Sequence, residues 1–327
     1  MMPTAIVTPV SASNGVRSLR PRCVSSTRSF GDSVMRRPYP GVTVFTRPVT
    51  YSIVARDSET GELGCAVQSQ AFNSGAAVPW VRAGVGAIAT QSFTDRRYGY
   101  RGLELLAAGR SPQDALDELR EPDELSGFRQ VAFLDASGAS AQWTGEHCIR
   151  CAGHVAGDGW AAQGNMLAAE CWHAMGETFE ATTGSLAQRL MAALDAAEAA
   201  GGDFRGRGGA GIVVVPAEGE PWERVIDLRV EEGDGSLVEL RRLLDRAEGY
   251  RAAFRSQPAA PVARERGLPE ITVRWLELMD AAEAGDVDEG RRILADLEAV
   301  HPHYRDNART ASLRPDTPPA LRAIVGE

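Results

Sequence analysis

The sequence predicts an α+β domain in which two antiparallel sheets stack face to face and helices cover their outer faces. The first observation is the order of the segments, because pairs of short strands alternate along the chain with pairs of helices. The second is that short turns join the strands within a pair, which is typical of antiparallel hairpins. The third is size, since 327 residues with 43% hydrophobic side chains can form one large core and a small extension.

The strands are predicted from short apolar or alternating runs that are bounded by turn residues. They are expected at residues 51–57, 63–69, 130–135, 139–144, 159–163, 212–215 and 224–230. The turn at 58–61 joins the first two strands into a hairpin. A further apolar stretch, 76–92, is interrupted at Pro79, Gly84 and Gly86.

The helices are predicted where apolar residues recur at helical spacing. They are expected at residues 102–108, 111–121, 166–180, 186–200, 236–254, 270–284 and 288–300. Ser111 is expected to cap the second of these, with Pro112 in its first turn. Ser185 and Gln188, three residues apart, predict a capping box at the start of another.

The long helix at 236–254 begins with a second predicted capping box, formed by Ser236 and Glu239. A linker at 257–261 follows, and a glycine separates the two helices of a small hairpin. The segment from His301 onward is rich in Arg and Pro, and His301 and His303 in it are expected to be solvated.

Composition excludes several classes of protein. No apolar run reaches the roughly 18 residues that a membrane-spanning helix needs. The net charge of −9 argues against nucleic acid as the main partner. All 35 basic residues are arginine, which excludes Schiff-base lysine chemistry and lysine-dependent phosphate loops. Five irregularly spaced cysteines favour a reducing cytoplasm over a disulfide framework.

Residues 1–49 differ in composition from the rest of the chain. They hold seven arginines and one acidic residue, and they show no sustained helical or alternating pattern. A secretory signal is not indicated, because the mildly apolar part precedes the arginines. We expect this leader to be disordered, or not to be translated.

Separated blocks of the sequence resemble the DUF1028 family. They read TYSIVARD at 50–57, TGELG at 60–64, VPW at 78–80, GVGAIATQS at 84–92, QGNML at 163–167 and GGDFRGR at 201–207. The resemblance implies a four-layer αββα sandwich similar to the N-terminal nucleophile (Ntn) hydrolases, over residues 50–256. The order of the elements agrees with this fold. Residues 257–327 resemble a peptidoglycan-binding extension, and equally a plain helical hairpin.

The resemblance makes Thr50 the N-terminal nucleophile. Domains of the family begin Met-Thr-aromatic-Ser, whereas Val49 precedes Thr50 here. We expect either a translation start at the codon of Val49 or a cleavage after it. Each event frees an α-amino group, with a pKa of about 7.7–8.0, that can accept the proton of the Thr50 hydroxyl. The alternative is that Thr50 is an ordinary β-branched residue at the start of a strand.

Other blocks of the resemblance supply further candidates. Asn165 is expected to offer an amide donor to an oxyanion, and Gln163 to orient it. Alternatively, Asn165 caps the helix predicted after it. Ser69, Thr90 and Gln91 end predicted strands, where side chains can point into a cleft and bind a substrate.

The glycine-rich turn at 201–207 carries Asp203 and Arg207. Arg207 is expected to bind a substrate carboxylate through a bidentate contact, although a structural Asp203–Arg207 ion pair is an alternative. The sequence departs from the family pattern at two places. Gly208-Gly209 replaces a usual Gln-Ser, and Gln70 stands where lysine is common.

A CxxC motif provides a competing site. Cys148 and Cys151, flanked by His147 and His154, have ligand types that suit zinc, or form a redox pair. All of these residues fall in one short segment, so we expect no metal and no cofactor. Cys171 is expected to lie in the core rather than to act as a nucleophile.

Two functions follow from the sequence. The first is an amidohydrolase that cleaves a non-peptide C–N bond of a small molecule, which is anionic if Arg207 binds it. The second is a non-catalytic binding protein on the same scaffold, with a tail that contacts a glycan or a protein partner. We expect a small-molecule substrate, no nucleic-acid or membrane partner, and a cytoplasmic location; a homo-oligomer is compatible with the sequence.

Overall fold

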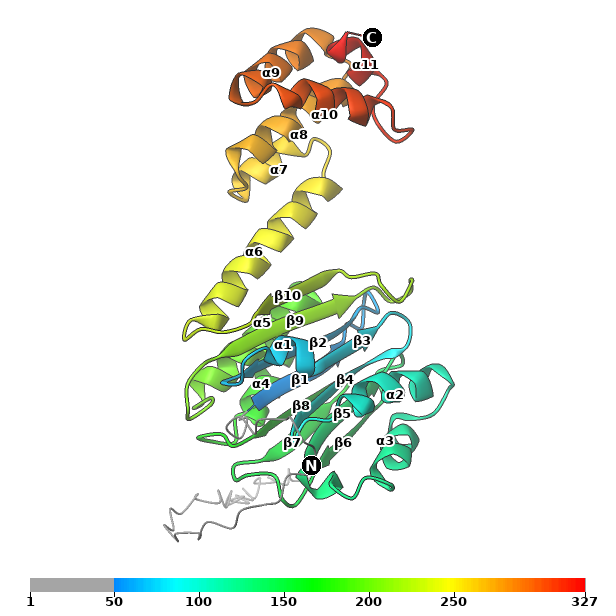
Figure 1. The fold of residues 1–327 in the computed structure, drawn as a ribbon, viewed down its shortest axis with the longest axis vertical. Coiled ribbons are helices and arrows are strands. Elements are labelled where there is room, and N and C mark those ends of the chain that lie inside the picture. Colours follow the sequence, from blue (N-terminus) through cyan, green and yellow to red (C-terminus); the bar gives the residue numbers. More distant parts are fainter. Residues whose placement is uncertain (1–49, 327) are drawn as a thin grey trace, which may run out of the picture. The chain divides into compact units, whose positions relative to one another are not determined.

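The computed structural model describes residues 50–326, so the predictions for the leader 1–49 lie outside the described residues. The strands are β1 Thr50–Arg56, β2 Leu63–Ser69, β3 Pro79–Arg82, β4 Gly86–Ser92, β5 Arg129–Asp135, β6 Ser140–Thr144, β7 Gly153–Gly157, β8 Trp160–Asn165, β9 Gly209–Val215 and β10 Ile226–Val230 (Figure 1). The helices are α1 Ser74–Ala77, α2 Arg96–Ala107, α3 Pro112–Arg120, α4 Trp172–Ala181, α5 Leu186–Ala199, α6 Ser236–Arg255, α7 Ala260–Glu265, α8 Glu270–Glu283, α9 Val287–Val300, α10 His303–Ser312 and α11 Ala320–Val325, with a 3₁₀ turn at Ser126–Phe128.

The strands form two antiparallel sheets. One sheet has the order β10-β9-β2-β1-β8-β7, and the other has the order β3-β4-β5-β6. Every strand pair is antiparallel, as in β1 with β2 and β1 with β8. The predicted mixture of helices and antiparallel sheets is therefore confirmed.

Side chains on alternate positions of each strand enter different cores. Val54 of β1 and Cys65 of β2 belong to a cluster shared with Ala89 and Ala132 of the four-stranded sheet. Ile53 of β1 packs instead with α4 and α5 in a second cluster. Helices α2 and α3 pack on the four-stranded sheet in a third cluster. The faces of the two sheets that meet are therefore apolar over most of their length.

Several elements differ from the prediction. Helix α2 begins at Arg96 rather than at residue 102, and α7 begins at Ala260, inside the predicted linker. Strand β7 lies where only a loop was expected, and its residues alternate between half-buried and exposed positions. Helix α4 begins at Trp172 rather than at residue 166, because Asn165 ends β8 and Met166 adopts a positive φ of 55°. The alternative role of Asn165 as a helix cap is therefore wrong.

The predicted helix caps were right at two of three sites. Ser111 accepts a hydrogen bond from the Asp114 backbone, and Ser185 forms a full capping box with Gln188. The box predicted for α6 is wrong. Gly235 is its N-cap, and the carboxylate of Glu239 binds Arg242 instead.

Helices α8 and α9 match the predicted hairpin, with Gly285 at a φ of 73° between them. His301 and His303 are exposed, as expected, and the segment that follows them is helical. Helices α10 and α11 form there because Ala308, Leu321 and Ile324 are buried in a core shared with α8 and α9. Within residues 50–326, no helix combines the length and apolar character needed to cross a membrane.

Candidate functional site

Thr50 begins β1 in the middle of the six-stranded sheet. It is paired across the sheet with Ser69 of β2 on one side and Asn165 of β8 on the other. Its side chain is buried, and Oγ1 donates a hydrogen bond to Ser69 Oγ at 3.0 Å. Ser69 Oγ also accepts the backbone N–H of Ala71 at 3.1 Å. The backbone therefore fixes Ser69, and Ser69 fixes the Thr50 hydroxyl.

A buried network of side-chain amides joins this point to the four-stranded sheet. Its centre is Gln130 of β5, whose Oε1 accepts hydrogen bonds from Gln91 Nε2 at 2.8 Å and Asn165 Nδ2 at 3.0 Å. Gln130 Nε2 donates to the carbonyl of Gly164 at 2.8 Å. Gln91 Nε2 also donates to the carbonyl of Thr50 at 3.3 Å. The network thus holds the backbone of Thr50 and the side chain of Asn165 together.

Ser52 and Gln163 extend the network along the interface between the sheets. Ser52 Oγ donates to Gln91 Oε1 at 2.6 Å, and Gln163 Nε2 donates to Ser52 Oγ at 3.3 Å. Gln163 Nε2 also donates to the carbonyl of Ala89 at 3.1 Å. Gln163 therefore reaches Asn165 through Ser52, Gln91 and Gln130 rather than directly.

Two acceptors in this network have no partner among the described residues. They are Asn165 Oδ1 and Gln163 Oε1, both fully buried. Buried polar atoms are normally paired in folded proteins. Because Asn165 is the sheet partner of Thr50, its Oδ1 is an unused acceptor near the N-terminal end of β1.

Thr90 does not belong to this buried hydrogen-bond network. Its neighbour Gln91 points between the two sheets, so alternation along β4 directs Thr90 to the opposite face. There its hydroxyl donates to the carbonyl of Asp95 at 3.2 Å. The structure therefore does not bring Thr90 together with Thr50.

The alternative Asp203–Arg207 ion pair is wrong. The Asp203 carboxylate binds Arg205 at 3.2 Å and accepts the backbone N–H of Gln70 at 2.9 Å. Arg207 Nε instead donates to Glu198 at 2.6 Å. The spacing of residues within the turn could not predict the partner of Arg207, because Glu198 lies outside the turn, at the end of α5.

Glu198 links Arg207 to the residue that follows Thr50. Its second carboxylate oxygen accepts a hydrogen bond from the hydroxyl of Tyr51 at 3.0 Å. Burial, followed by the nearby Glu198 carboxylate, raises the pKa of Tyr51 far above its usual value. Tyr51 packs with α4 and α5, so Arg207 is tied to the face of the sheet opposite to the Thr50 side chain.

The two positions at which the sequence departs from the family pattern, Gln70 and Gly208-Gly209, lie next to each other. The backbone N–H of Gly208 donates to the carbonyl of Ser69 at 3.0 Å. A Cβ atom at Gly208 would lie 2.1 Å from the carbonyl oxygen of Gln70. Any side chain at position 208 would therefore force the loop after β2 to move.

The residues of the CxxC segment make other contacts. The described residues contain no group of three or more His, Cys, Asp or Glu side chains placed to hold a metal ion. The ring of His147 packs on Phe128 with centroids 4.7 Å apart, and His154 bonds to Thr144 Oγ1 at 2.8 Å. Cys171 is buried, and burial raises the pKa of its thiol to about 12. This thiol is therefore a poor nucleophile at neutral pH.

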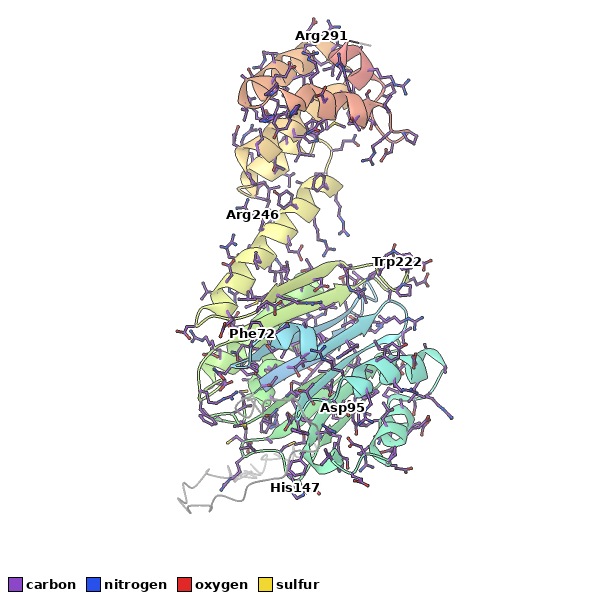
Figure 2. The ribbon with its side chains drawn as sticks, viewed as in Figure 1. Phe72, Asp95, His147, Trp222, Arg246 and Arg291 are labelled. Atoms are coloured by element: carbon purple, nitrogen blue, oxygen red, sulfur yellow. The ribbon has the colours of Figure 1, made fainter. Side chains whose placement is uncertain are left out.

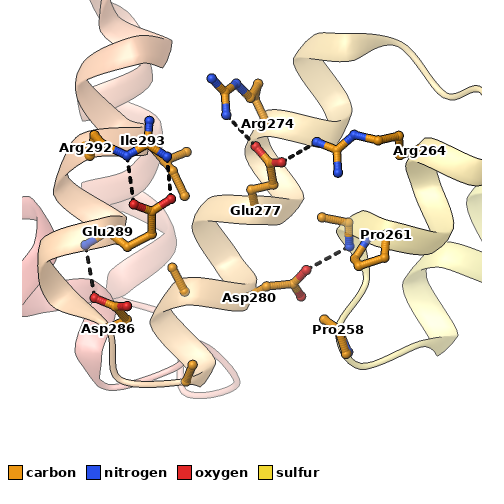
Figure 3. A pocket seen from close by; sticks show the side chains of 13 residues that line it. Pro258, Pro261, Arg264, Arg274, Glu277, Asp280, Asp286, Glu289, Arg292 and Ile293 are labelled. Atoms are coloured by element: carbon orange, nitrogen blue, oxygen red, sulfur yellow. Dashed lines mark hydrogen bonds and ion pairs between the residues drawn. The ribbon is translucent and has the colours of Figure 1, made fainter.

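A cavity of about 330 Å³ lies between α7, α8 and α9 (Figure 3), and none of the predicted site residues lines it. The charged side chains that line it are largely paired with one another. Arg264 and Arg274 both bind Glu277, and Arg292 binds Glu289. The Asp280 carboxylate accepts the backbone N–H groups at the start of α7.

Sequence reasoning missed two residues of the network, Ser52 and Gln130. Both are fully buried polar side chains in strands that are otherwise apolar. That pattern was visible in the run RQVAFLD, where the glutamine precedes buried apolar residues. It identifies a polar residue in a core, but not the partners that satisfy it.

Comparisons with known proteins place these residues in a family. The model of a family described as "Family of unknown function (DUF1028)" matches residues 50–240. The crystal structure of protein SPO2555 from Silicibacter pomeroyi, of the same family model, has a TM-score of 0.56 and 29% sequence identity, covering 66% of this chain and 94% of that chain. Anbu (ancestral beta-subunit) from Yersinia bercovieri has a TM-score of 0.32 and 12% identity, covering 64% of this chain and 98% of that chain. No curated protein matches the sequence.

Proposed function

Because the chain belongs to the DUF1028 family, whose function is unknown, we propose from its own site that it is an amidohydrolase with Thr50 as N-terminal nucleophile. The substrate is a small molecule with a non-peptide amide C–N bond. The fold proposed with this activity is the four-layer αββα sandwich of Ntn hydrolases over residues 50–256. Helices α7 to α11 follow this domain in the chain.

The observation that carries the proposal is the environment of the Thr50 hydroxyl. Oγ1 is buried and hydrogen-bonded to Ser69 Oγ at 3.0 Å, at the end of a strand rather than in its middle. The neutral amides of Gln91, Gln130 and Asn165 form one hydrogen-bonded network, and Gln91 binds the carbonyl of Thr50. A threonine with only a structural role in the strand would not require a buried polar network beside it.

The proposed reaction needs a free α-amino group on Thr50. The amine accepts the proton of Oγ1, and Oγ1 attacks the carbonyl carbon of the substrate amide. The C–N bond then breaks, and the departing amine takes the proton. Water attacks the resulting ester on Thr50 and releases the carboxylic acid. The amine matters because the chain contains no lysine, and because His154 on β7 bonds to Thr144 Oγ1.

Asn165 has two features that suit this chemistry. One N–H of its amide binds Gln130 and the other is available for the oxyanion of the tetrahedral intermediate. Its Oδ1 has no partner among the described residues, so it can accept a hydrogen bond from the Thr50 amine. The network fixes the amide through Gln130.

A non-catalytic binding protein is the second candidate, and the pairing of Arg207 favours it. Glu198 neutralises Arg207, and Gly208 leaves a position without a side chain. These two facts remove the binding groups that the family pattern would provide for an anionic substrate.

The test compares variants of the protein with a free Thr50 amine on a panel of simple amides. Thr50→Ala should reduce turnover by at least about 10³-fold, whereas Thr50→Ser should retain part of it. Thr182→Ala is the matched control, because that hydroxyl donates only to the carbonyl of Thr178, on α4. Turnover by Thr50→Ala equal to that of the parent would show that the nucleophile is wrong and would favour the binding protein.

A further inference from the structure

Exposed phenylalanines gather at the ends of the strands that carry the site. Among residues 50–326, the exposed ones are Phe72, Phe93, Phe204 and Phe254. Phe72 follows β2 three residues after Ser69, Phe93 directly follows β4, and Phe204 lies in the turn before β9 (Figure 2 labels Phe72). Phe254, on α6, is the exception. Single exposed apolar residues are common, but a group of them beside a polar site marks a surface that binds apolar groups.

The loops that carry Phe72 and Phe204 are held together. Three hydrogen bonds, two of them between backbone groups, join residues 69–73 to residues 203–209. They are Gln70 N to the Asp203 carboxylate (2.9 Å), Gly208 N to the Ser69 carbonyl (3.0 Å) and Gly209 N to the Ala71 carbonyl (3.3 Å). A fourth bond, from Asn73 N to the Glu231 carbonyl at 2.9 Å, fixes the far side of the first loop. These bonds fix the backbones of both loops, while the rings of Phe72 and Phe204 are exposed.

This surface begins next to the reacting group. Ser69, which anchors the first loop, accepts the hydrogen bond of the Thr50 hydroxyl. An extended group attached to an amide at Thr50 would reach the loop that carries Phe72.

The surroundings carry little free charge. Residues 63–81 contain no charged side chain. In the neighbouring turn, Arg205 binds Asp203 and Arg207 binds Glu198. The amides and hydroxyls around Thr50 are also neutral. A charged substrate would find few unpaired counter-charges here, whereas an apolar group would find exposed phenyl rings.

We propose that Phe72 and Phe204 form the apolar part of the substrate site, and that the substrate is a neutral amide with an alkyl or aryl acyl group. The inference rests on the proposed function for the position of the amide at Thr50. It replaces the anionic substrate that the sequence indicated with a neutral one.

The test measures selectivity for chain length with the purified protein that carries a free Thr50 amine. The substrates are the p-nitroanilides of acetic and octanoic acid, which share one leaving group. Binding of octanamide and acetamide is measured by calorimetry in parallel, because binding does not require turnover. We expect the octanoyl compounds to have the higher kcat/KM and the lower Kd. The double variant Phe72→Ala, Phe204→Ala should lose on the order of tenfold for octanoyl compounds and less than twofold for acetyl ones.

Phe254→Ala removes an equally exposed ring from α6 and is the control. Equal losses for both chain lengths would show that the two rings act only on the structure, and would overturn the inference. Equal binding of octanamide and acetamide by the parent would also overturn it. If octanamide binds selectively through Phe72 and Phe204 but no anilide is cleaved, the proposed amidohydrolase fails while the apolar site stands.

Discussion

Replacing Gln130 by leucine removes the centre of the buried network while keeping a side chain of similar size. The Asn165 Nδ2 group then loses its hydrogen bond to Gln130, and its Oδ1 already lacks a partner among the described residues. Gln91 Nε2 keeps its hydrogen bond to the carbonyl of Thr50, at 3.3 Å. The carbonyl of Gly164 loses a donor at 2.8 Å.

These losses set the expected magnitude. Leaving one buried polar group unpaired costs about 1–3 kcal/mol, and the substitution strips at least the Asn165 amide and the Gly164 carbonyl of a partner. The apolar leucine offsets part of this cost. We therefore expect Gln130→Leu to lower the free energy of unfolding by about 2–4 kcal/mol. We also expect it to lower any turnover, since the Asn165 amide is no longer oriented.

Urea denaturation followed by tryptophan fluorescence measures the change. Gln142→Leu is the control, because Gln142 is half-buried on neighbouring β6 and its amide donates to Ser140 Oγ. This control should stay within about 0.5 kcal/mol of the parent. If Gln130→Leu also stays within that range, the network does not stabilise the fold, and the argument from buried amides is wrong.

Three further substitutions test the packing and the electrostatics. Gly176→Ala should lower the free energy of unfolding by about 1–3 kcal/mol in urea titrations, since its Cβ would lie 2.0 Å from the Trp160 ring; an unchanged midpoint would contradict that contact. Asp123→Asn should cost about 3 kcal/mol by the same assay, because it removes a carboxylate 2.9 Å from the buried guanidinium of Arg129; a loss below 1 kcal/mol would refute this. Burial alone would raise the pKa of Asp57, but hydrogen bonds from its own turn lower it. Asp57→Asn should therefore lower the free energy of unfolding by about 1–2 kcal/mol at pH 7. The difference from the parent should shrink as the pH falls below about 4. A difference that does not change with pH would show that folding does not lower the pKa of this carboxyl group.

The sequence was a good guide to elements that one local signal defines. The first hairpin, the capping box at Ser185 and the helices on either side of Gly285 each have such a signal, and the structure has them. Helices α10 and α11 have a weaker signal. Their few apolar residues are buried only because α8 and α9 lie beside them.

The candidate site was predictable to a lesser degree. Ser69 and Asn165 lie beside Thr50 because their strands pair with β1 in register. Gln91 reaches Thr50 from the other sheet, where its amide donates to the Thr50 carbonyl. The orientation of Thr90 follows from strand alternation, which a list of strand-end residues ignores.

The pairing of distant side chains was not predictable from the sequence. The bond between Arg207 and Glu198 joins a turn to the end of α5, and Gln130 binds partners on β4, β6, β7 and β8. Such contacts depend on how the two sheets pack, which no spacing within one segment encodes.

The most direct test of the central claim is mass spectrometry of the N-terminus of the native protein after reaction with an octanoyl ester. The account predicts a polypeptide that begins at Thr50 and carries the octanoyl group on the Thr50 hydroxyl. A protein in which Val49 remains bonded to Thr50, with no acyl group on that residue, would contradict the account.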